Sequence, residues 1–271
     1  MVRITSCLVC VVVLFTTLAH SQTLRYSTGC VRVYVANGCP GPDLPATIPE
    51  GNNFRTWYNM GGFQLFSGWN NGNVWGSDFR DAANGDLESN GGSDVPEIYL
   101  YAGHGICQNP PNATSPDFIA VCGNFGIPNN TTIGTGSRWG NGSGNLRFAF
   151  IDASCPMDLV SLSNQWFPVY RGLHMGLGHS GTSTQDALDS DVRGTGLGAY
   201  TSGALWLLPE LSVGDAWMLV GVKDIQSGCA AVALAVGNSR NDAINRRENE
   251  RVKGNMSDPT PNWAAWKWIR R

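Results

Sequence analysis

Charged side chains are scarce in this sequence. Asp, Glu, Lys and Arg make up 14% of its 271 residues, only four histidines are present, and the formal net charge is -3. Neither a strongly basic nucleic-acid-binding surface nor a polyacidic chain is therefore indicated. Only the stretch 244–271 is basic, with seven Lys or Arg against three acids. Because a tail of this kind is more often solvated or packed on an acidic body, we expect no nucleic-acid partner.

Long hydrophobic runs are also absent after residue 21. A membrane span needs about 20 apolar residues, so we expect none in that part of the sequence. The first segment does contain a shorter apolar run, residues 7–18, which follows Arg3 and precedes Ala-His-Ser. This pattern is typical of a signal peptide. We expect residues 1–21 to be removed, which leaves a secreted, extracellular protein without a membrane span that begins near Gln22. An N-terminal anchor that is never cut is the alternative.

The mature sequence lacks a CxxC pair and any Cys/His cluster at metal-ligand spacing, so we expect no metal and no cofactor. Its six cysteines are Cys30, Cys39, Cys107, Cys122, Cys155 and Cys229. Secretion favours disulfides, and short loops predict two local pairs, Cys30–Cys39 and Cys107–Cys122. Cys155 and Cys229 are left over, and they either remain thiols or pair with each other.

Sequons for N-glycosylation are plentiful. They occur at Asn112, Asn129, Asn130, Asn141 and Asn255. Four of the five fall within residues 106–145, a stretch rich in Asn, Gly, Pro and Thr. Because a glycan needs an exposed attachment site, we expect this stretch to be a glycosylated surface loop outside the core.

Apolar runs and helix-compatible spacings alternate along the chain. Strands are predicted at 31–35, 98–102, 146–151, 173–177 and 230–236, and helices at 157–170 and 205–222. The aromatic-rich stretch 54–80 favours a core layer over a sugar-stacking surface. The Trp-rich tail is predicted as a helix or arm that packs back on the body. This order indicates one α/β domain over residues 22–271 with a mostly parallel central sheet.

Two of the predicted strands end in reactive side chains. The first runs into Gly103-His104-Gly105 and the second into Asp152-Ala153-Ser154-Cys155. Sites in open α/β sheets form at the carboxyl ends of strands. A thiolate is a nucleophile, and an imidazole beside it can stabilise the thiolate and protonate a leaving group. Glycine at position 105 allows its amide to approach a developing oxyanion.

These segments, IYLYAGHG at 98–105 and FAFIDASC at 148–155, resemble the hallmark of the caspase-like cysteine peptidases. Their separation, 155 − 104 = 51, is close to the roughly 50 residues of caspases. The resemblance implies a three-layer caspase-like sandwich, with His104 and Cys155 catalytic, Gly105 an oxyanion donor and a peptide or protein as substrate. The chain also resembles secreted proteins of this superfold that have no assigned substrate. It departs from familiar members in Pro156 and Met157, where they place a glycine two residues after the cysteine.

Other motifs suggest other chemistries. Residues 176–181 match GxGxxG, which needs a helix opening there to bind a dinucleotide, and the same stretch resembles a serine nucleophile elbow. Acids between Asp186 and Asp191 offer paired carboxylates, although a Gly/Ser/Thr-rich loop favours solvated side chains. His174 and His179, five residues apart, are poorly placed as joint metal ligands.

Two hypotheses from different classes remain. The first is a secreted caspase-like cysteine hydrolase that acts on peptide or amide bonds through Cys155 and His104. The second is a non-catalytic secreted glycoprotein on the same scaffold, which binds glycan or protein. The thiol state distinguishes them, because a peptidase needs Cys155 reduced, whereas a scaffold can oxidise it. The oligomeric state cannot be predicted from this pattern.

Overall fold

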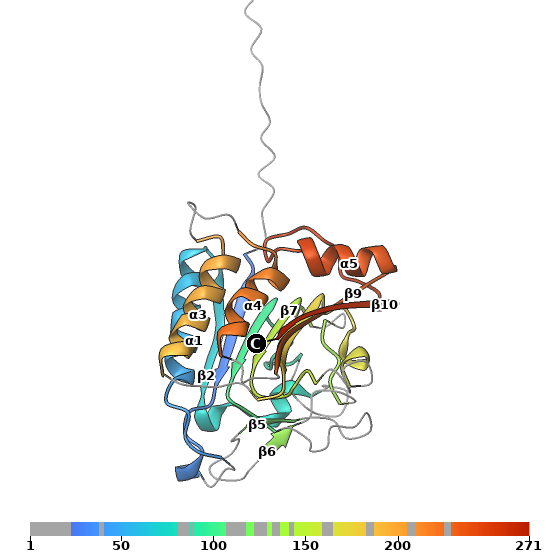
Figure 1. The fold of residues 1–271 in the computed structure, drawn as a ribbon. Helices are drawn as coiled ribbons and strands as arrows, with labels where there is room; N and C mark the ends of the chain where they lie inside the picture. Colours follow the sequence, from blue (N-terminus) through green and yellow to red (C-terminus); the bar gives the residue numbers. More distant parts are fainter. Residues whose placement is uncertain are drawn as a thin grey trace, which may run out of the picture.

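The computed structural model describes residues 23–37, 41–80, 87, 89–106, 118–121, 129–131, 136–140, 144–158, 165–182, 187–204, 210–224 and 229–270. Its centre is a mixed, largely parallel sheet of seven strands (Figure 1). From one edge to the other these are β2 (Gln64–Asn70), β1 (Arg25–Cys30), β3 (Ile98–Ala102), β7 (Phe148–Asp152), β8 (Met175–Ser180), β9 (Ala230–Gly237) and β10 (Trp263–Arg270). The first five are parallel, and β9 is antiparallel to both of its neighbours. The predicted α/β class with a mostly parallel sheet is confirmed.

Four α-helices belong to the described part of the chain. They are α1 (Thr47–Met60), α3 (Ala187–Thr201), α4 (Val213–Gly221) and α5 (Arg240–Asn249). Two begin at serine N-caps, since Ser212 accepts the amide of Asp215 before α4 and Ser239 accepts the amide of Asp242 before α5. Asp215 is also the acidic residue in the first turn of α4, a helix that lies within the range 205–222 predicted as helical.

The sheet buries apolar side chains on both faces, as continuous apolar strands require. One core cluster joins Tyr26, Leu100 and Phe150 to side chains of α1, α3 and α4. The opposite cluster joins Tyr99 and Ile151 to aromatic residues from the connections between the strands. In the described residues the helices therefore cover one face, and loops with short 3-10 turns cover the other.

A second, three-stranded sheet occupies part of the long excursion after β3. It consists of β4 (His104–Ile106), β5 (Phe118–Val121) and β6 (Asn129–Thr131), and it lies apart from the central sheet. The excursion is therefore not wholly a loop. Nor does it stay outside the core, because Trp139 is fully buried against Trp166. Residues 107–117 and 141–143, with Asn112 and Asn141, lie outside the described residues.

Several predicted elements are wrong or misplaced. The strand expected at 31–35 lies earlier in the chain, as β1 at Arg25–Cys30, and Val35–Asn37 forms a 3-10 turn. The tail is the edge strand β10, and its tryptophans are 45 to 52% exposed. Within the range 157–170, residues 159–164 lie outside the described residues, Gln165 and Trp166 are α-helical, and Phe167–Val169 forms a short 3-10 turn. The aromatic stretch 54–80 is only partly core, because Phe54 is buried and Phe66 is 40% exposed.

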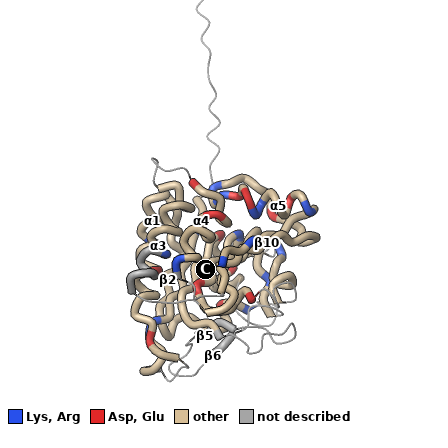
Figure 2. The backbone as a smooth tube through the Cα atoms, viewed as in Figure 1, with Lys and Arg blue, Asp and Glu red and all other residues tan. Residues whose placement is uncertain are grey.

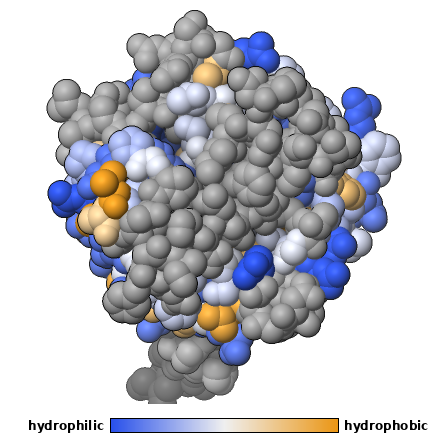
Figure 3. All heavy atoms as spheres, turned by 90° about the horizontal axis from the view of Figure 1, so that it is seen from below, coloured by the Kyte–Doolittle hydropathy of each residue, from blue (hydrophilic) through white to orange (hydrophobic). Residues whose placement is uncertain are grey.

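The charged residues are few and unevenly placed. Figure 2 shows most of the backbone without charge and a concentration of both signs around α5. Seen from below, where β5 and β6 lie, the described apolar side chains form small separate patches (Figure 3). Among the described residues, no helix has the length and apolar character needed to cross a membrane.

Candidate functional site at the carboxyl ends of the parallel strands

The strands that lead to His104 and Cys155 are neighbours. β3 and β7 pair in parallel, with Ala102 opposite Asp152. Their carboxyl ends therefore reach the same edge of the sheet about 5 Å apart. A hydrogen bond from the Gly103 amide to the Asp152 carbonyl, 3.1 Å long, continues this pairing beyond the strands. The two strand ends are therefore neighbours in the sheet.

Gly105 packs directly on the backbone that precedes Cys155. A Cβ built on residue 105 would lie 2.7 Å from the carbonyl carbon of Ser154 and 2.8 Å from its amide nitrogen. Contacts under 3 Å essentially never occur for real Cβ atoms. Only glycine therefore fits at this position without displacing one of the two segments.

His104 is held through its backbone by two tyrosines. Its amide donates to the Tyr34 hydroxyl at 2.8 Å, and its carbonyl accepts from the Tyr101 hydroxyl at 3.3 Å. Tyr34 and Tyr101 are both fully buried. The His104 backbone is therefore anchored between the end of β3 and the segment that follows β1.

The hydrogen bond of the His104 imidazole defines its neutral tautomer. Its Nε2 lies 2.7 Å from the Pro42 carbonyl oxygen, which can only accept, so Nε2 carries a proton, and in the neutral ring Nδ1 is then the bare nitrogen. Burial lowers the pKa of His104, and the bond to Pro42 opposes this effect. The ring also contacts the edge of Tyr34, with centroids 4.5 Å apart. A neutral imidazole with a bare Nδ1 can act as a base through that nitrogen.

Cys155 differs most from what a nucleophile requires. It is disulfide-bonded, and its partner lies outside the described residues, because Cys30 and Cys229 are both free. Its backbone has the left-handed φ of +66°, unusual for a non-glycine residue, and the residue is 2% exposed. Its amide donates to the Gly181 carbonyl at 2.9 Å, so this amide is not a free donor for an oxyanion. A disulfide sulfur cannot act as a thiolate.

These findings correct one predicted cysteine pair and decide between two open alternatives for Cys229. Cys30 is free at the buried end of β1, so the pair with Cys39 is wrong. Burial raises the pKa of the Cys30 thiol to about 12, and the nearby Glu50 carboxylate adds to that effect. The alternative pair of Cys155 with Cys229 is also wrong, since Cys229 is free. Cys107 and Cys122 lie outside the described residues.

A buried ionic cluster lies beside the strand ends and has no counterpart among the predicted site residues. Asp152 Oδ1 is 3.1 Å from His179 Nε2, and Asp152 Oδ2 is 2.6 Å from Arg193 Nε. Burial acts to raise the pKa of Asp152, but Arg193 and His179 outweigh it and hold that pKa below its usual range. The polar end of the apolar run 148–152 marks Asp152 in the sequence, whereas nothing there marks Arg193 as its partner.

A second buried cluster lies at the opposite end of β8. His174 Nδ1 bonds Glu250, and His174 Nε2 is 3.0 Å from Asp258. Arg246 approaches the other Glu250 oxygen at 3.5 Å. His174 and His179 therefore belong to separate clusters. Among the described residues, no group of three or more His, Cys, Asp or Glu side chains could hold a metal ion.

The remaining motifs do not form the sites that their patterns suggest. Residues 176–181 run along β8 and its end, so no helix opens there for a dinucleotide or a nucleophile elbow. Asp189 and Asp191 fall within α3, not in a loop, and Asp186 lies outside the described residues. Asn129 and Asn130 lie in β6, and Asn255 is exposed.

Comparison with known proteins gives one match. The family model described as a domain of unknown function, DUF6345, matches residues 32–271. No curated protein and no solved structure matches the chain.

Proposed function

The chain belongs to the DUF6345 family, and from this premise we propose that it is a secreted caspase-like cysteine hydrolase that is latent while Cys155 is oxidised. Its substrates are peptide or amide bonds. One observation carries the proposal, namely that the Gly105 backbone packs against the backbone of Ser154 at the ends of two adjacent parallel strands. This contact supports the proposal because its two residues adjoin His104 and Cys155, the two residues of the caspase-like pattern.

The strand order supports a caspase-like sandwich. The order β2-β1-β3-β7-β8 is that of a doubly wound sheet, with its switch point between β1 and β3. Crevices for ligands form at the carboxyl ends of strands at such a point, and His104 follows β3 there. Helices α1, α3 and α4 supply one outer layer, and loops supply the other in the described residues.

The proposed reaction begins with activation. An external dithiol reduces the Cys155 disulfide to two thiols and is itself oxidised to a disulfide. Bare Nδ1 of His104 then accepts the Cys155 proton. The thiolate attacks the substrate carbonyl carbon, with Gly105 as an amide donor to the oxyanion. The C–N bond breaks, His104 returns the proton to the departing amine, and water hydrolyses the thioester to a carboxylic acid and free thiol.

A second candidate function is favoured by the oxidation state of the sulfur. With Cys155 in a disulfide and its amide bonded to Gly181, the centre has neither a thiolate nor a free amide at that residue. In this form the chain is a non-catalytic secreted glycoprotein that binds glycan or protein. The exposed Trp263, Trp266 and Trp268 of β10 are then its most accessible aromatic contacts.

Peptide hydrolysis after reduction tests the proposal. Mature protein is treated with a dithiol and assayed with a mixture of fluorogenic peptide amides. We expect hydrolysis only after reduction, with a loss of roughly a hundredfold or more in Cys155→Ala and His104→Ala. Cys229→Ala is the matched cysteine control and should keep full activity. A folded, reduced wild type that cleaves none of the peptides, or a Cys155→Ala variant that cleaves them equally well, overturns the hydrolase.

A further inference from the structure

A pocket of about 510 Å³ lies at the opposite end of the sheet from His104 and Cys155. Leu24, Phe63 and Arg147 line it, and each stands immediately before a parallel strand, β1, β2 and β7 respectively. The turn after α1 and the segment 253–255 after α5 complete the wall. Its volume lies within the roughly 300–1,000 Å³ of small-molecule sites.

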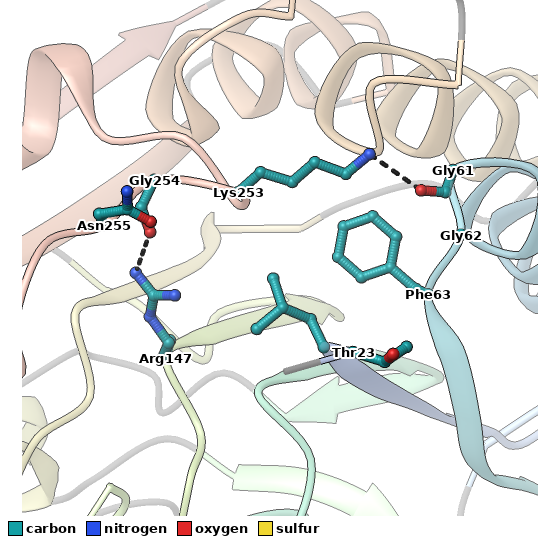
Figure 4. A pocket seen from close by; sticks show the side chains of 9 residues that line it. Thr23, Gly61, Gly62, Phe63, Arg147, Lys253, Gly254 and Asn255 are labelled. Atoms are coloured by element: carbon teal, nitrogen blue, oxygen red, sulfur yellow. Dashed lines mark hydrogen bonds between the residues drawn. The ribbon is translucent and has the colours of Figure 1, made fainter. Parts of the chain in front are cut away.

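Two cations bridge the walls of this pocket (Figure 4). Lys253 extends across the Phe63 ring, with Nζ 5.2 Å from the ring centroid, and donates to the Gly61 carbonyl at 2.9 Å. Arg147 donates through Nη2 to the Gly254 carbonyl at 3.0 Å. Gly61 is the C-cap residue of α1, where a lysine bond to a carbonyl is favourable. Both cations are thus held at the pocket by backbone carbonyls.

The lining is positive. Lys253 and Arg147 contribute two positive charges, and among the described lining residues there is no Asp or Glu. Outside the lining, Glu210 Oε2 and Lys253 Nζ both lie near Gly203, 3.7 Å and 3.4 Å from where its Cβ would be. The nearest acid to Arg147 is Glu250, 3.5 Å from Nη2, which is fully buried and shared with Arg246 and His174.

We propose that this pocket binds a small carboxylic acid with an apolar body. The carboxylate accepts from Arg147 and Lys253, which is the charge-assisted geometry that guanidinium and ammonium groups provide. The apolar body packs on Phe63, which is 6% exposed, and on Leu24 beside it. The site is separate from the cysteine centre, so it binds its ligand whether Cys155 is oxidised or reduced.

Calorimetric titration of the mature protein with hexanoate, beside the isosteric neutral hexanamide, tests this site. We expect hexanoate to bind at least about tenfold more tightly than hexanamide. Lys253→Gln keeps a hydrogen-bond donor but removes the charge, so it should weaken hexanoate binding by a similar factor. Arg147→Gln should weaken hexanoate binding as well. Arg251→Gln removes an exposed charge from the same segment but not from the lining, and is expected to leave binding unchanged.

Three results overturn the site. One is the absence of hexanoate binding by the folded wild type, and another is equal binding of hexanoate and hexanamide. The third is a loss in Arg251→Gln as large as that in Lys253→Gln, because binding would then follow overall charge and not the pocket. If Arg147→Gln fails to fold, Lys253→Gln alone decides, since Lys253 is exposed and its side chain can be replaced without leaving a buried charge.

Discussion

Gly105 touches the main chain of Ser154 so closely that a Cβ on residue 105 would approach the Ser154 carbonyl carbon to 2.7 Å. Because the contacting atoms of Ser154 are backbone atoms, they cannot move aside as a flexible side chain would. Gly105→Ala should therefore lower the free energy of unfolding by about 1–3 kcal/mol and separate the two strand ends. Urea denaturation measures the loss. Gly136→Ala is the matched control, since among the described residues its Cβ would meet only Arg80 Cγ, at 3.9 Å. Equal stability of the two variants would contradict the contact.

Tyr34 anchors the His104 backbone through its hydroxyl. Tyr34→Phe removes the acceptor of the His104 amide, so this partly buried donor loses its partner. We expect a loss of about 1–3 kcal/mol and faster amide hydrogen exchange at His104. Tyr200→Phe serves as the control, because its hydroxyl makes no hydrogen bond to another described residue and the residue is only half-buried. Unchanged exchange at His104 in Tyr34→Phe would show that the hydroxyl does not hold this segment.

The Asp152 carboxylate makes the free energy of unfolding depend on pH in the acidic range. Arg193 and His179 hold its folded pKa below the value of about 3.9 expected in the unfolded chain, despite the opposing effect of burial. The group therefore contributes stability that is fully present above about pH 4 and is lost as the pH falls toward the folded pKa. Asp152→Asn should flatten the decline of urea midpoints below pH 4 relative to the wild type. Parallel declines in the two proteins would contradict this linkage.

Arg193→Gln probes the same cluster from the other side. It leaves a fully buried Asp152 carboxylate without its cation, so we expect a loss of about 3–5 kcal/mol at pH 7. The double variant Arg193→Gln/Asp152→Asn should recover part of this loss, because no buried charge then lacks a partner. Additive losses in the double variant would rule out direct coupling.

Asn255 is the exposed sequon in the described part of the chain. If the protein is secreted, a glycan on Asn255 and a first residue near Gln22 are expected in material from a eukaryotic host. Peptide mass spectrometry before and after glycosidase treatment measures both. Ser257→Ala removes the acceptor sequence, while the Ser257 carbonyl still accepts from Arg246. Secreted wild type without sugar at Asn255 would contradict the prediction.

The strands of the sheet centre could be predicted because their residues are almost continuously apolar. The runs at 98–102 and 230–236 coincide closely with β3 and β9, which are buried on both faces. The edge strand β10 could not be predicted in this way. It mixes Trp263, Lys267 and Arg270 in a pattern that fits a helix or an arm, and only pairing with β9 determines its conformation.

Helix α3 was missed because its glycines argue against a helix. Their role appears only in three dimensions. A Cβ on Gly194 would lie 2.8 Å from the Glu50 carbonyl carbon, and one on Gly198 would lie 2.7 Å from Trp57 Cβ. The glycines thus allow α3 to pack closely on α1, and this packing outweighs their low helix propensity. Cysteine pairing also depends on distances in space, which is why the pair of Cys30 with Cys39 was predicted wrongly and the state of Cys229 stayed open.

The alkylation rate of Cys155 tests the central claim most directly. Iodoacetamide at about pH 6 labels a thiolate, whereas an ordinary cysteine, with a pKa of about 8.5, is mostly inert there. We predict no label on Cys155 before reduction. After reduction with a dithiol, Cys155 should be labelled faster than Cys229. His104→Ala should slow the labelling of Cys155, while the labelling rate of Cys229 stays the same. Cys30, with a pKa of about 12, should remain the slowest of the three. Labelling of reduced Cys155 at the same rate with and without His104 would contradict the hydrolase and leave the non-catalytic glycoprotein.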